Sequence, residues 1–129
     1  MRQIFKVRTL LLASLLTFSI ASATAGSGHD LKPKFGGVVV ETKAGDVEIV
    51  AKPDSIQIHI TDHGKVVKLE GAKAKVTLLN GAEKSEVTLS PAGDKLEAKG
   101  AFKITKGTKG IAFVTLAGKS ATTARFEIR

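Results

Sequence analysis

The chain of 129 residues contains no cysteine, no tryptophan and no tyrosine, and its only methionine is the initiator. Without cysteine, a disulfide scaffold, a thiolate nucleophile, a zinc–thiolate site and an iron–sulfur cluster are all excluded. Cu(I) sites prefer thiolate or thioether ligands, so they are excluded as well. The metal ligands that remain are imidazoles and carboxylates, which suit Cu(II) or Zn(II).

Aromatic residues are also scarce, at 5% of the chain, although basic residues outnumber acidic ones by 20 to 12. The lysines occur singly along the sequence and form no basic run. Nucleic-acid binding requires clustered positive charge interleaved with stacking aromatics, so we expect no nucleic-acid partner. We interpret the lysines as a solvated outer face and as protection of edge strands. The sequence contains no nucleophile elbow, no distinctive carboxylate pair and no phosphate-binding glycine loop, which predicts a non-enzymatic protein.

Residues 1–25 have the pattern of a cleaved secretory signal peptide. Three basic residues precede an apolar run from Leu10 to Ile20, and Ala23-Thr24-Ala25 matches a small-x-small cleavage site. The apolar run is about half of the roughly 20 residues that a membrane span needs, so we expect no stable membrane insertion after cleavage. Cleavage after Ala25 would remove three of the 20 basic residues and none of the 12 acidic ones, leaving 17 against 12 and a net charge of +5.

The remaining chain begins with a Gly/Ser-rich stretch at 26–35, which we expect to be a flexible lead-in. From residue 36 to 129, short β-branched runs recur about every ten residues, with turn residues between them. This spacing predicts one all-β domain, an immunoglobulin-like β-sandwich of about seven to nine short antiparallel strands. The clearest strand is Ser55 to Asp62, the clearest hairpin turn is Asn80-Gly81, and a further strand is expected over Ala101 to Thr105.

The candidate metal ligands gather around one strand and turn. His59 lies in the alternating strand, and Asp62 and His63 lie at its end. Residues four apart on a strand are about 13 Å apart, so the two imidazoles share an ion only if the turn folds His63 back. Two interpretations stay open: two surface histidines on an open sheet face, or a Cu(II) or Zn(II) site that includes Asp62 or a cross-strand carboxylate.

The third histidine, His29, suggests a separate metal site. If trimming left Ser27 at the N-terminus, the imidazole of His29 would stand third behind a free α-amine. That arrangement can wrap four nitrogens around a square-planar Cu(II) or Ni(II). With cleavage after Ala25, His29 is fourth and the arrangement is lost.

Four segments resemble, as a set, those of small periplasmic proteins of Gram-negative bacteria that are associated with heavy-metal or copper efflux systems. They are KPKFGGVVVE at 32–41, VEIVA at 47–51, DHGK at 62–65 and PAGDKLEAKG at 91–100. The resemblance covers most of residues 32–128. It implies a periplasmic location and a periplasmic efflux component as partner. In that group the position of Phe35 is usually histidine; here we expect Phe35 to pack over the end of the sandwich.

The sequence and the resemblance together predict a non-enzymatic periplasmic accessory or carrier protein in copper-type metal-ion homeostasis. His59, His63, Asp62 and His29 are its candidate metal ligands. The alternative is an interaction module without a ligand of its own. Such a module would bind another envelope protein through a sheet edge or through the Val38-Val39-Val40 strand.

Overall fold

The computed structural model describes residues 31–129, so the predicted signal peptide and His29 lie outside the described residues. Within residues 31–129 the chain forms nine strands, and every pairing is antiparallel. The strands are β1 (Val38–Thr42), β2 (Gly45–Ala51), β3 (Ser55–Asp62), β4 (Lys65–Val66), β5 (Lys73–Asn80), β6 (Glu83–Ala92), β7 (Lys95–Lys99), β8 (Lys109–Thr115) and β9 (Thr122–Glu127). No helix in this part of the chain is long and apolar enough to cross a membrane.

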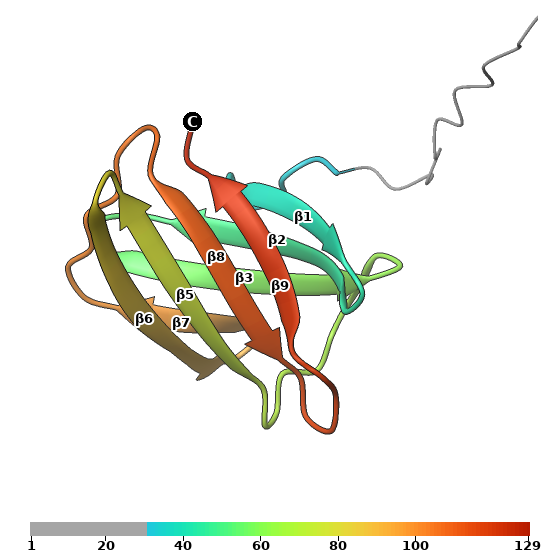
Figure 1. The fold of residues 1–129 in the computed structure, drawn as a ribbon. Coiled ribbons are helices and arrows are strands. Elements are labelled where there is room, and N and C mark those ends of the chain that lie inside the picture. The colour runs from blue at the N-terminus through green and yellow to red at the C-terminus, as the bar shows by residue number, and fades with distance from the viewer. Residues whose placement is uncertain (1–30) are drawn as a thin grey trace, which may run out of the picture.

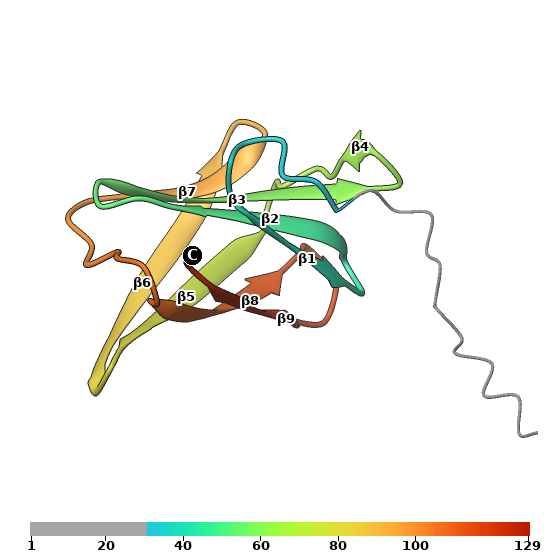
Figure 2. The same ribbon diagram turned by 90° about the horizontal axis from the view of Figure 1, so that it is seen from above.

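The strands form one continuous sheet in the order β1-β2-β3-β7-β6-β5-β8-β9, with the short β4 paired to β3 (Figure 1). Strand β6 pairs with β5 along its first part and with β7 over Ser90–Ala92, so it carries the sheet from one layer to the other. Figure 2 shows β2, β3 and β7 in one layer and β5, β8 and β9 in the other. The two end strands, β1 and β9, approach each other without pairing, and the sheet is therefore nearly closed.

The predicted all-β class and the short antiparallel strands are confirmed. The immunoglobulin-like sandwich is not what the pairing shows, because the strands belong to one curled sheet and not to two separate ones. The predicted strand over Ala101–Thr105 is wrong: this segment is a loop, although Phe102 and Ile104 still pack against the core.

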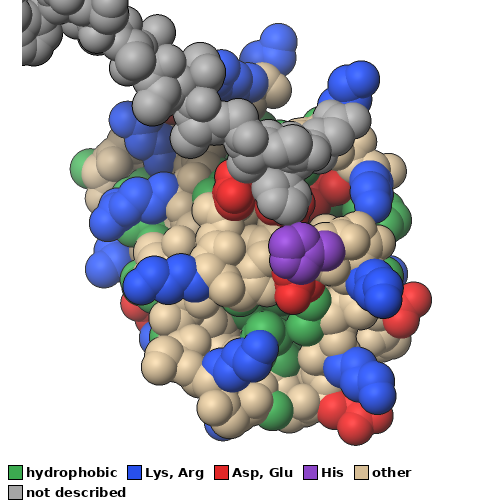
Figure 3. Space-filling model, turned by 90° about the vertical axis from the view of Figure 1, so that its right-hand side faces the viewer, with side chains coloured by type: hydrophobic (Ala, Val, Ile, Leu, Met, Phe, Trp, Pro, Cys, Tyr) green, Lys and Arg blue, Asp and Glu red, His purple; other side chains and the backbone are tan. Residues whose placement is uncertain are grey.

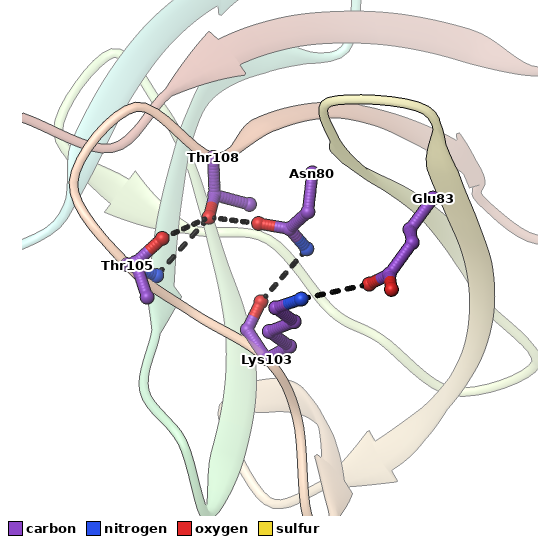
Figure 4. A network of polar contacts seen from close by, with 5 residues as sticks. All are labelled: Asn80, Glu83, Lys103, Thr105 and Thr108. Carbon is purple, nitrogen blue, oxygen red and sulfur yellow. Dashed lines mark hydrogen bonds and ion pairs between the residues drawn. The ribbon is translucent and has the colours of Figure 1, made fainter.

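That loop is held by polar contacts that replace strand pairing (Figure 4). The Asn80 side-chain amide donates to the carbonyl of Lys103 at 3.0 Å, and the buried hydroxyl of Thr108 donates to Asn80 Oδ1 at 2.6 Å. Lys103 Nζ also lies 2.9 Å from Glu83 Oε2. These contacts fix the connection between β7 and β8 against the β5–β6 hairpin.

The core lies between the two layers and is built from alternating positions. In β3 the side chains of Ile56, Ile58 and Ile60 are at most 1% exposed, as the period-two pattern predicts. Strands β5, β6 and β8 contribute Val76, Leu89, Val114 and other aliphatic side chains to the same core. Phe126 of β9 lies across from Gly110 of β8, where any Cβ would overlap the phenylalanine ring. Close packing against the Phe126 ring therefore requires glycine at position 110.

Candidate functional site

The structure separates the two histidines that the sequence places near one turn. His59 lies in the middle of β3 and pairs with Glu48 of β2. His63 lies in the β3–β4 turn with its side chain 82% exposed, and its φ of 49° continues the left-handed turn that Gly64 completes at 80°. Among residues 31–129, no three His, Asp, Glu or Cys side chains are placed to hold one metal ion.

Asp62 and His63 do lie together, with Oδ1 and Nε2 3.5 Å apart. They line a hollow of about 230 Å³ that also includes Glu41 and Asp46. Figure 3, which shows the right-hand side of Figure 1, has a histidine next to acidic side chains, with lysine and arginine spaced singly around them. Lys43 lines the same hollow, and the acidic positions do not converge on one point.

The sequence analysis did not identify Glu48 as a functional residue. Its side chain is only 5% exposed, and its carboxylate accepts three backbone N–H groups from the segment before β1. Lys34 donates to Oε1 at 2.7 Å, while Phe35 and Gly37 donate to Oε2 at 2.8 and 3.0 Å. Hydrogen bonds to an ionised acceptor are among the strong ones, so Glu48 holds residues 34–37 over the outer face of β2.

The ring of Phe35 stacks on the imidazole of His59, with centroids 3.8 Å apart and planes 12° apart. Phe35 therefore packs on the outer face of β3, and not over the end of a sandwich. The Gln57 amide donates to Glu97 Oε2, which leaves its Oε1 to accept from His59 Nε2 at 3.2 Å. We call Phe35, Glu48 and His59 the latch, because together they fasten the chain entering β1 to the sheet.

Partial burial lowers the pKa of His59 below its ordinary value, and the nearby charge of Lys95 lowers it further. The carboxylates of Glu48 and Glu97 act in the opposite direction but do not outweigh burial. A neutral imidazole is a metal ligand in principle. Here one ring face is covered by Phe35, and Nε2 already has Gln57 as its partner, so the imidazole is used in packing.

A larger hollow, of about 610 Å³, lies between the two ends of the sheet. Its lining comes from the first residues of β1, the last residues of β2 and the chain from Arg125 onward. The apolar part of its lining comes from Val38, Val40, Ile49, Val50, Phe126 and Ile128. We call it the β1–β9 hollow. Both strands beside it pair on one side only, so the opposite backbone edge of each has no partner strand among the described residues.

The rim of the β1–β9 hollow is mainly basic. Lys52, Arg125 and Arg129 line it together with one acidic side chain, Glu127. On the outer face of the β8–β9 pair, Glu127 lies across from Lys109, whereas Arg125 lies across from the uncharged Ile111. The charge of Arg125 is therefore not matched by its cross-strand neighbour.

The four residues proposed as metal ligands are thus accounted for as far as the structure describes them. Asp62 and His63 are adjacent, His59 is elsewhere on the sheet, and His29 lies outside the described residues.

In comparisons with known proteins, no family model, curated protein or solved structure matches this chain. The residues that the sequence analysis did not single out are Glu48 and Arg125. A lone acid inside the apolar run Val47-Glu48-Ile49-Val50 was the available signal for Glu48.

Proposed function

We propose that this chain is an exported, non-enzymatic interaction module that binds an extended segment of another envelope protein in the β1–β9 hollow. The observation that carries the proposal is a hollow with aliphatic lining beside the edges of β1 and β9, which approach each other within residues 31–129 but do not pair, so that each edge lacks a partner strand. Free N–H and C=O groups on such edges are the usual template for strand addition, in which an incoming backbone supplies the missing hydrogen bonds.

The side chains beside these edges suit such a partner. Val38, Val39 and Val40 are each only half-buried, although they form the strand next to the opening. An added strand would cover these apolar groups and the nearby Ile128 while pairing its backbone. Main-chain bonds then supply affinity, and the pockets for alternate side chains supply specificity.

Metal-ion homeostasis is the second candidate function, with a periplasmic efflux component as the partner that the resemblance implies. The pair formed by Asp62 and His63 favours it, since both side chains are exposed and line one hollow together with Glu41 and Asp46. It ranks second because a stable Cu(II) or Zn(II) site needs more ligands around one point than this pair supplies. A partner from an efflux system is compatible with the interaction module and does not require the metal.

The test uses the protein as recovered from expressing cells and a library of displayed extended peptides. We expect selected peptides to slow amide hydrogen exchange in β1 or β9 and to leave β3, in the middle of the sheet, unchanged. The matched control is the same peptide with an N-methyl group at every residue, which has no backbone N–H left to donate along either edge. Protection that maps elsewhere, or equal binding by the N-methylated peptide, would contradict strand addition in this hollow.

A further inference from the structure

Resting on the proposed function, we infer that the segment bound in the β1–β9 hollow is an acidic strand in which carboxylate side chains alternate with apolar ones. The juxtaposition that carries this inference is a patch of aliphatic side chains beside a rim in which Lys52, Arg125 and Arg129 outnumber the one acidic side chain, Glu127. It specifies the chemistry of the partner, which the free edges alone do not.

Strand β9 dictates the alternation. Its inward positions, Ala124 and Phe126, are 1% and 6% exposed, while Thr123, Arg125 and Glu127 point outward and are exposed. A strand that pairs with β9 must share this pleat, so its side chains also alternate between the interior and the outer face. Inward side chains meet the apolar lining near Phe126, which favours aliphatic residues. Outward ones meet the charged face.

The outward face favours acids at the position beside Arg125. Within β8 and β9, the other outward charge, Glu127, already faces Lys109 across the pair, but Arg125 faces Ile111. On the far side of the hollow, Lys52 adds a second cation. Neither Lys52 nor Arg125 has an ion pair or side-chain hydrogen bond with any residue of the described part. Opposite charges directly across from each other stabilise strand pairs, and like charges destabilise them.

The same charges argue against a basic segment as occupant. A lysine-bearing strand would bring like charges beside Arg125 and Lys52 at the edge of an apolar hollow, where water screens them less than on an open surface. Its one favourable partner would be Glu127, which Lys109 already faces. Attraction of acidic side chains and repulsion of basic ones therefore both favour an acidic segment as the partner.

The experiment compares two labelled synthetic peptides, one of alternating valine and glutamate and one of alternating valine and lysine. Binding to the protein is followed by fluorescence anisotropy. We expect the glutamate peptide to bind about fivefold or more tightly than the lysine peptide, from the strength of cross-strand charge pairs. Arg125→Glu should reverse the preference. Lys119→Glu, the same charge change in the exposed turn between β8 and β9, should leave it in place.

The outcomes separate this inference from the proposed function. Equal binding of both peptides, with protection in β1 or β9, would overturn the acidic partner and leave strand addition standing. Binding of neither peptide would count against the inference, while the displayed library decides strand addition by itself. Two further results would also overturn the acidic strand: an Arg125-dependent attraction to anionic phosphatidylglycerol vesicles that exceeds peptide binding, or an Arg125-dependent dimer of the protein that excludes the peptide.

Discussion

Glu48 offers the sharpest test of how the chain entering β1 is fixed. Glu48→Gln keeps the size and shape of the side chain but replaces one carboxylate oxygen with an NH2 group that faces a backbone donor. Three charge-assisted hydrogen bonds are affected: two lose their charge assistance, at about 1 kcal/mol each, and one is lost. Because Lys34 and Phe35 are exposed, water replaces part of what is lost. We therefore expect the free energy of unfolding to fall by about 2–3 kcal/mol.

For a domain of this size, that loss corresponds to a decrease in Tm of about 10 °C. The assay is urea denaturation together with amide hydrogen exchange, since the amides of Phe35 and Gly37 should exchange faster in the variant. Glu70→Gln is the matched control, because Glu70 is exposed and has no ion pair or side-chain hydrogen bond in the described part of the chain. An unfolding free energy for Glu48→Gln within about 0.5 kcal/mol of the control, with unchanged exchange at residues 34–37, would refute the latch.

Four further outcomes follow from the packing and the charges. Gly110→Ala should destabilise the protein by about 2 kcal/mol in thermal unfolding, because the added methyl overlaps the ring of Phe126. Thr108→Val should cost about 2 kcal/mol by the same measurement, since it removes the buried hydroxyl that bonds with the amide and hydroxyl of Thr105 and with Asn80 Oδ1. The pKa of His59 is lower in the folded chain than in the unfolded one, so its contribution to stability is complete above about pH 6.5 and is lost as the pH falls through the folded value. His59→Gln should therefore make urea unfolding less sensitive to acid, and an unchanged acid sensitivity would contradict this contribution. Calorimetric titration with Cu(II) and Zn(II) should give at most weak binding, lost in His63→Ala; affinity unchanged in both His59→Ala and His63→Ala would eliminate these imidazoles as ligands.

The sheet was largely predictable because its signals are local. The alternation in β3 buries Ile56, Ile58 and Ile60, and the hairpin between β5 and β6 forms where the Asn-Gly sequence predicts it. The turn itself lies one residue later than expected, at Gly81-Ala82, because Asn80 still pairs with Glu83. Period-two burial does not determine which strand lies beside which. A sandwich and a nearly closed single sheet use the same alternation, and only the pairing of β6 with both β5 and β7 distinguishes them.

The site was less predictable because it depends on contacts between distant parts of the chain. An acid at an outward strand position is expected to be solvated, yet Glu48 is buried because the chain some 11 to 14 residues earlier folds over it. The loop at 101–105 shows the same limit: its apolar alternation is genuine, but the Asn80 amide takes the carbonyl that a neighbouring strand would need. In both cases a polar side chain, not the apolar pattern, decides the backbone path.

The latch and the β1–β9 hollow are structurally linked through the start of β1. Gly37 donates to Glu48 and also lines the hollow, and a Cβ on Gly37 would overlap the carbonyl of Ile49. The latch therefore sets where β1 begins and how closely it lies on β2, which in turn positions one wall of the hollow. Arg125 lies on the opposite wall and takes no part in these contacts. The shape of the hollow thus depends on Glu48, whereas the charge of the hollow depends on Arg125. The two properties can therefore be altered independently.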